Sequence, residues 1–189
     1  MIVLGIDPGS RRAGIAVIEQ KSPGGPMTML MAETLRLESL DQHTARLLLI
    51  HDSVEEAIRL HKPNLMTIET PVYGLDPLAM LKLGRAQASA ILAATRHDLE
   101  VREIYPKAVK KAITGNGNAS KEQVAGMVQT YLPGQEIPTS TDATDAIAIA
   151  LCGIFHGDSM AQGAASQSTR TKGNWSQFVK DNPSRVRPA

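Results

Sequence analysis

Cysteine and aromatic residues are scarce in this sequence. Its 189 residues include one cysteine, Cys152, and aromatic residues make up 3%. One cysteine cannot form an intrachain disulfide, which excludes a disulfide-stapled scaffold and fits a reducing compartment. We therefore expect a cytoplasmic protein in which Cys152, which has apolar neighbours, lies in the core.

Long apolar runs and a strong net charge are missing as well. No apolar stretch approaches the roughly 20 residues needed to span a bilayer, and no charged-then-apolar leader precedes the strand-like run at residues 2–6. We expect neither a membrane partner nor a secretory signal. The formal net charge is only +1, so a nucleic-acid partner requires a local concentration of basic residues.

The apolar pattern predicts three strands followed by alternating strands and helices. Short apolar runs bounded by turn residues predict strands, and apolar positions spaced three and four apart predict helices. Short connections between the first three strands predict an antiparallel meander. The predicted fold class is therefore α/β, with a mixed five-stranded sheet flanked by helices on both faces. The expected strands are 2–7, 13–19, 28–37, 65–69 and 100–105, and the expected helices are 42–61, 77–97, a short one after Pro106, 120–131 and 141–156.

Composition divides the chain near residue 157. The segment 157–189 is rich in Gly, Ala, Ser, Gln and Asn, and it carries five basic residues against two acids. We expect residues 1–156 to form one domain and residues 157–189 to be a polar, basic and disordered tail.

Four carboxylates occupy positions that a purely structural sequence would not favour. Asp7 and Glu69 each end an apolar strand, where functional groups of α/β sheets collect. Asp142 and Asp145 open an otherwise apolar helix and lie on one face of it. Taken singly, each acid is better explained as a helix cap or a turn residue. Taken together, they converge if the two acidic strands are neighbours and the last helix packs beside them.

A cluster of carboxylates without histidine or cysteine provides only oxygen ligands. That chemistry suits Mg²⁺ or Mn²⁺ better than zinc. Several carboxylates can hold two such ions, which together promote phosphodiester hydrolysis. The four acids therefore predict a metal-dependent nuclease.

Six short segments together resemble the RuvC family of Holliday-junction resolvases. They occur in the family's order and spacing between residue 2 and about residue 156. Each is a weak signal alone, and the set in order is specific. The segments are Leu4-Gly5-Ile6-Asp7-Pro8-Gly9-Ser10, Ile68-Glu69, Leu81-Lys82-Leu83-Gly84 with Ala86, Gly115-Asn116-Gly117, Lys121-Glu122-Gln123-Val124, and Asp142-Ala143-Thr144-Asp145-Ala146 with Ala148 and Ala150.

The resemblance implies an RNase H-like fold and a homodimer that makes paired, symmetric incisions in four-way DNA junctions. It implies that Asp7, Glu69, Asp142 and Asp145 are metal ligands for two Mg²⁺ ions, with Mn²⁺ as a substitute. Lys110 and Lys121 match family lysines that support DNA binding and catalysis, and Lys121 is counted among the catalytic residues. A cellular member would work with a branch-migration motor such as the RuvA–RuvB complex, whereas a phage member would not need it.

Further candidate DNA contacts come from local charge and from one aromatic residue. Between residues 101 and 121 there are five basic residues and one acid, Glu103. Lys107 and Lys111 belong to this cluster, which is otherwise read as a solvated lysine face. Arg85, in the alanine-rich helix, is a further candidate. The sequence departs from the family after Glu69, where Val72 replaces a frequent phenylalanine. Tyr73 beside it is either a wedge that stacks on junction bases or a core residue.

Three rival interpretations remain. Actin-like ATPases and sugar kinases also begin with a strand and an acidic glycine turn, but they need two such domains. A YqgF-type RNase H-like nuclease acting on RNA has a similar start, although the alanine-rich helix and the Asp142–Asp145 pair fit RuvC better. An inactive junction-binding module is opposed by the presence of all four acids.

Overall fold

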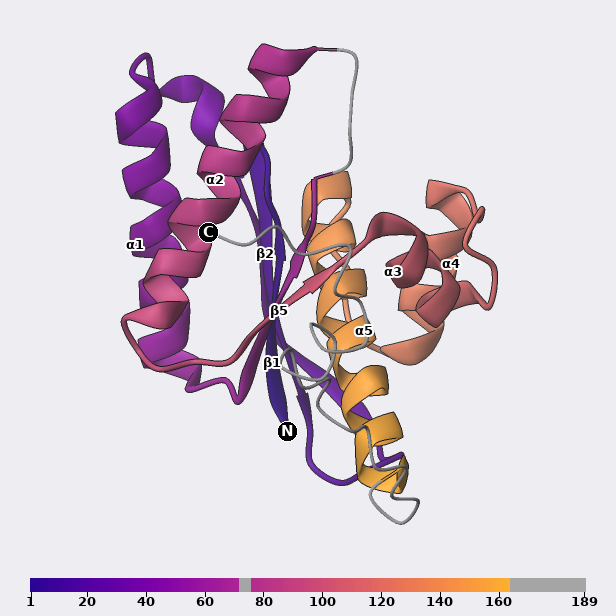
Figure 1. The fold of residues 1–189 in the computed structure, drawn as a ribbon. Coiled ribbons are helices and arrows are strands. Elements are labelled where there is room, and N and C mark those ends of the chain that lie inside the picture. The colour runs from indigo at the N-terminus through magenta and orange to yellow at the C-terminus, as the bar shows by residue number, and fades with distance from the viewer. Residues whose placement is uncertain (72–75, 164–189) are drawn as a thin grey trace, which may run out of the picture. The chain divides into compact units, whose positions relative to one another are not determined.

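The protein is built around a five-stranded sheet, seen nearly edge-on in Figure 1. The computed structural model describes residues 1–71 and 76–163. The strand order is β3-β2-β1-β4-β5. The strands are β1 (Ile2–Asp7), β2 (Arg12–Gln20), β3 (Met27–Arg36), β4 (Leu65–Glu69) and β5 (Val101–Ile104).

Strand pairing confirms the predicted mixed sheet. β1 pairs antiparallel with β2, and β2 pairs antiparallel with β3. β4 lies parallel to β1 on its other side, and β5 lies parallel to β4. The meander thus supplies the antiparallel half, and the strand–helix alternation supplies the parallel half because each crossover helix returns the chain to the same end of the sheet.

The helices cover both faces of the sheet, as predicted. Figure 1 shows α1 (His43–His61) and α2 (Pro77–Thr95) on one face, and α5 (Thr141–Gly163) with α3 (Pro106–Thr114) and α4 (Lys121–Tyr131) on the other. A short 3-10 helix, η1 (Leu37–Ser39), follows β3 and was not anticipated. Among the described residues, no helix combines the length and hydropathy needed to cross a bilayer.

Successive residues of each strand point to opposite faces of the sheet and belong to two separate hydrophobic cores. Val3, Ala16 and Leu65 belong to the core shared with α3, α4 and α5. Leu4, Ile6 and Ile68 belong to the core shared with α1 and α2. Because side chains alternate along a strand, this assignment also decides which face each functional residue at a strand end occupies.

Local signals set the starts of two helices near the site. Ser120 is the N-cap of α4, as predicted, and forms a reciprocal capping box with Gln123. Asp76 caps α2 by accepting hydrogen bonds from the backbone of Leu78 and Ala79, with Pro77 in the first turn.

The expected end of the last helix at residue 156 is wrong, because α5 continues to Gly163. The apolar pattern marks the part of a helix that is buried, and a helix can continue past it. The compact unit that contains the sheet ends at Ser159. The expected disordered tail lies largely outside the described residues.

Candidate metal-dependent active site

Asp7 and Glu69 are brought together by parallel strand pairing. Ile6 is the register partner of Ile68, so the next residues, Asp7 and Glu69, end neighbouring strands at the same edge of the sheet. Asp7 shares its face of the sheet with Val3, and Glu69 shares its face with Leu65, both of which pack toward α5. Both carboxylates therefore end on the face that α5 covers.

Glycines let α5 approach the sheet closely at this point. Gly14 is the register partner of Asp7, and a Cβ on Gly14 would overlap the backbone oxygen of Asp142. A Cβ on Gly5 would likewise overlap the backbone of Ala146. The first turn of α5, which carries Asp142 and Asp145, consequently lies directly over the end of β1.

Polar contacts hold α5 in this position. The buried Thr67 hydroxyl, on β4, donates a hydrogen bond to the Ile149 carbonyl at 3.0 Å. Ser140, just before α5, is hydrogen-bonded to the Thr34 hydroxyl on β3. The Thr144 hydroxyl donates to the Ser140 carbonyl at 3.0 Å. These bonds reach α5 from two different strands, which restricts its shift along the sheet.

The electrostatics of the site show that the negative charges of the acids act on one another, although no three of the four have ligand atoms within 4.8 Å of one another in the part of the chain that the structure describes. Burial raises the pKa of Asp7 from 3.8 to about 8, and the negative charges of Glu69, Asp145 and Asp142 raise it further. Burial, with Asp145 next in importance, raises the pKa of Glu69 from 4.5 to about 7. A cation placed among these carboxylates would relieve this repulsion and favour their charged forms.

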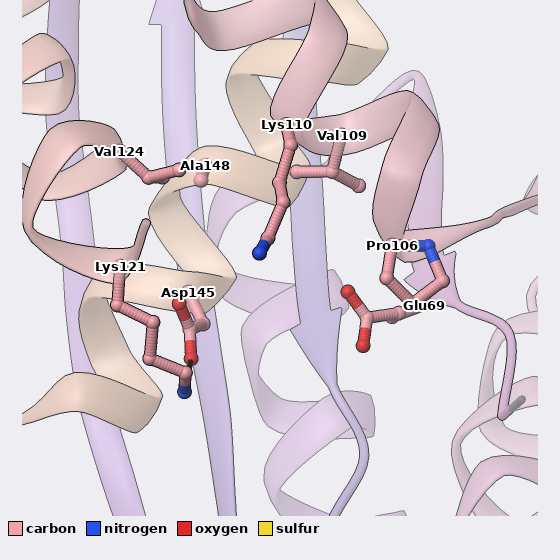
Figure 2. A pocket seen from close by; sticks show the side chains of 8 residues that line it. All are labelled: Glu69, Pro106, Val109, Lys110, Lys121, Val124, Asp145 and Ala148. Atoms are coloured by element: carbon pink, nitrogen blue, oxygen red, sulfur yellow. Dashed lines mark hydrogen bonds and ion pairs between the residues drawn. The ribbon is translucent and has the colours of Figure 1, made fainter. Parts of the chain in front are cut away.

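Two lysines lie beside the acids. The Lys121 Nζ donates a hydrogen bond to Oδ2 of Asp145 at 2.9 Å. Lys110, on α3, lines the same pocket of about 250 Å³ as Glu69, Asp145 and Lys121. Figure 2 shows the side chains of Lys110 and Glu69 pointing into the space beside the Lys121–Asp145 pair. The pocket thus brings two carboxylates, Glu69 and Asp145, next to two lysine ammonium groups.

Of the candidates that the structure describes, Asp7, Asp142, Lys107, Lys111 and Arg85 are not among the residues that line this pocket. Lys107 and Lys111 are exposed on α3, and Arg85 is exposed on α2, which covers the opposite face of the sheet. Tyr73 lies outside the described residues.

Three charged residues near the site, Arg11, Arg12 and Glu38, were not singled out in the sequence. Together with Ser10 and Asp142 they line a second, shallow hollow. Arg11 and Arg12 are adjacent in the sequence and could have been noticed as a basic pair after the Asp7 turn. Glu38 is brought to them only by the pairing of β2 with β3, and no sequence signal indicates it.

The donor set fits hard divalent cations. The cluster presents carboxylate oxygens from Asp7, Glu69, Asp142 and Asp145, which are the ligands that Mg²⁺ and Mn²⁺ prefer. A different group, formed by His51, Asp52 and Glu55, has ligand atoms within 4.8 Å of one another. That group lies on α1, so it is separate from the carboxylate cluster.

Comparison with known proteins decides the family. The family model described as crossover junction endodeoxyribonuclease RuvC matches residues 3–153. The chain belongs to the RuvC family. The RuvC of Salinibacter ruber is 45% identical over 186 residues, covering 98% of this chain and 99% of that protein. The RuvC of Porphyromonas gingivalis is 41% identical over 188 residues, with coverages of 98% and 97%.

Solved RuvC structures share the fold. A structure of Thermus thermophilus RuvC in complex with a Holliday junction substrate aligns with a TM-score of 0.79 at 30% identity, covering 85% of this chain and 96% of that one. The RNase H-like architecture expected from the sequence is therefore confirmed, as is membership of a family of nucleases that use divalent metal ions.

Proposed function

We propose that this RuvC family protein resolves four-way DNA junctions by metal-dependent hydrolysis of two symmetry-related phosphodiester bonds. The observation that carries the proposal is the convergence of four carboxylates from β1, β4 and α5 at one sheet edge, next to two lysines. Asp7, Glu69, Asp142 and Asp145 would hold two Mg²⁺ ions, which Mn²⁺ can replace. When bound, such ions activate a water nucleophile and stabilise the leaving oxygen.

The protein's own groups position the substrate. Lys110 projects into the pocket toward the space in front of Glu69, where its charge can bind a non-bridging phosphate oxygen. Lys121 holds Asp145 by a hydrogen bond and offsets the repulsion within the acid cluster. Lys107 and Lys111, exposed on α3, extend the positive surface for neighbouring phosphates. Arg85 and Tyr73 remain proposed DNA contacts from the sequence alone.

The exposed face of α2 supports the homodimer. Leu78, Leu81 and Leu92 are 68%, 51% and 61% exposed. With the exposed Arg85 and Ala88 they follow a three-four spacing and form one line, which we call the α2 stripe. This spacing is that of the seam between two packed helices. The opposite face of α2 carries the buried Ala86, Ala90 and Ala93, so the stripe points away from the sheet.

A two-fold dimer built on this stripe fits a junction, which itself has approximate two-fold symmetry. Each protomer would then present one active site to one of two equivalent strands. We extend the proposal to cytoplasmic action on chromosomal junctions, together with a branch-migration motor of the RuvA–RuvB type.

Cleavage of synthetic substrates tests the function. With Mg²⁺, the protein should incise a four-way junction and leave a linear duplex of the same sequence and a structured RNA intact. Asp7→Asn, Glu69→Gln, Asp142→Asn and Asp145→Asn should each lose cleavage by orders of magnitude while junction binding survives. Preferential cutting of the RNA would support the YqgF-type alternative, and binding without cutting by the wild type would support the inactive module.

A further inference from the structure

Every phosphodiester that is cut has neighbouring phosphates on both sides, and the acid cluster repels both. The pocket of about 250 Å³ can hold the DNA strand on one side of the scissile phosphate, because Lys110 and Lys121 line it together with Asp145. Asp142 faces the second hollow, which is lined by Ser10, Arg11, Arg12 and Glu38. The first pocket is therefore lined by Asp145 and the second hollow by Asp142, and these two acids lie three residues apart on α5.

We propose that Arg11 and Arg12 form a second phosphate-binding site, which holds the incised DNA strand on the side of the scissile phosphate opposite to Lys110. The proposal rests on the proposed nuclease function and extends it to the path of the strand. We call this group, made of Arg11, Arg12 and Glu38, the arginine hollow.

The geometry of the arginine hollow presents both guanidinium groups to solvent. Arg12 Nε donates to Oε1 of Glu38 at 3.0 Å, and Arg11 Nε lies 3.5 Å from Oε2 of the same carboxylate. The side chains of Arg11 and Arg12 remain 78% and 57% exposed. Five donors on each guanidinium cannot all be satisfied by one shared carboxylate, so donors stay available for a phosphate.

The backbone around the hollow is fixed. The Glu38 amide donates to the Arg11 carbonyl at 2.9 Å, which ties η1 to the turn after β1. Arg46, on α1, donates to the Leu40 carbonyl at 2.7 Å and to the Ser10 carbonyl at 3.4 Å. These hydrogen bonds fix the backbone that carries the two arginines, which follow Asp7 closely in the sequence.

The local charge favours an anion. Arg36 is the register partner of Arg12 and also acts electrostatically on Glu38. Three arginines therefore lie near two carboxylates, Glu38 and Asp142, so the local charge stays positive by one. Glu38 competes with a phosphate for the guanidinium groups, so it limits affinity as well as orienting them.

This competition yields a test. A phosphate-binding site and a purely structural ion pair predict opposite changes in junction affinity when Glu38 is replaced. Arg11→Ala/Arg12→Ala and Glu38→Gln break the same ion pairs. If the pairs only stabilise the turn, both variants weaken junction binding or leave it unchanged. If the arginines bind phosphate, the double variant weakens binding, whereas Glu38→Gln strengthens it by about two- to fivefold because an exposed competing ion pair is removed.

The experiment measures dissociation constants for a synthetic four-way junction at several salt concentrations, with EDTA present so that no cleavage occurs. The double variant should bind about tenfold more weakly or worse, and its log–log salt slope should fall by about one for each phosphate that the arginines no longer neutralise. Arg59→Ala, an exposed arginine on α1, is the matched control and should bind like the wild type.

Phosphate ethylation interference locates the contact. In the wild type, ethylation should interfere on both sides of the scissile phosphate. The double variant should lose interference on the side of the scissile phosphate that faces the arginines. Lys110→Ala should keep interference on that side and lose it on the other. Equal binding by the double variant and Arg59→Ala, or weaker binding by Glu38→Gln, would overturn the site. Cleavage by the wild type tests the proposed function separately, so either can fail while the other stands.

Discussion

Lys121, the first residue of α4, donates a hydrogen bond from its Nζ to Oδ2 of Asp145 in the first turn of α5, at 2.9 Å. This hydrogen bond, together with the nearby carboxylates, raises the pKa of Lys121. The lysine therefore stays charged and, like Lys110, places a positive charge beside the acid cluster. It ties the helical pair α3–α4 to the catalytic edge of the sheet.

Replacing Lys121 with methionine should separate its two effects. Without its charge, the acid cluster is less compensated, so the metal-free protein should be less stable and Mg²⁺ should raise its melting temperature more than in the wild type. Single-turnover junction cleavage should fall by about 100-fold or more. Lys21→Met, which is exposed and lies beyond the other end of β1 from Asp7, is the control. Unchanged cleavage by Lys121→Met would show that the lysine is only structural.

Stability of the metal-free protein should depend on pH through Asp7. Its pKa is 3.8 ordinarily and about 8 in the folded protein, so the folded state binds the proton more tightly. Stability is therefore greatest at low pH within this window and is lost as the pH rises from about 4 to about 8. Glu69 acts in the same direction, with a folded pKa of about 7.

Thermal melts in EDTA at pH 5.5 and pH 8.5 check this dependence. The melting temperature should fall at the higher pH, and Asp7→Asn should reduce the fall because an amide does not ionise. Mg²⁺ should raise the melting temperature of the wild type at pH 8.5 more than that of Asp7→Asn. A metal-free protein that is more stable at pH 8.5 would contradict the electrostatic description of the cluster.

The strand-end acids show what the sequence could predict. Asp7 and Glu69 stand out because each follows an apolar run, and parallel pairing then brings them together. The element order followed from periodicity in the same way. The contribution of Glu38 could not be predicted, because a long-range strand pairing places it beside Arg12. The length of α5 was also missed, since only its buried part carries an apolar signal.

Sheet–helix contact predicts a specific role for Gly14. Alanine there would place a Cβ against the Asp142 backbone oxygen, so α5 must shift or the protein must strain. We expect a loss of about 1–3 kcal/mol in the free energy of unfolding and reduced cleavage. Gly126→Ala, in α4 and with open space around it, should instead be neutral or stabilising by up to about 1 kcal/mol. Denaturant unfolding of both variants measures the difference, and equal stabilities would count against the close packing.

The α2 stripe predicts how the proposed dimer forms. Leu81→Asp replaces an exposed apolar side chain of the stripe with a carboxylate and should convert the proposed dimer to a monomer. Leu60→Asp, at a 70% exposed position on α1, should leave the dimer intact. Sedimentation or light scattering at micromolar concentration distinguishes the two. A Leu81→Asp protein that remains dimeric would place the interface elsewhere.

Resolution of a cruciform plasmid tests the central claim most directly. A supercoiled plasmid with an extruded inverted repeat presents one four-way junction, and paired incisions across it convert the circle to a linear molecule. With Mg²⁺, the wild-type protein should yield linear DNA cut at the base of the cruciform, and Asp7→Asn should yield none. Accumulation of nicked circles without linear product, or equal cutting of a plasmid that lacks the inverted repeat, would contradict the assignment of this site to symmetric junction resolution.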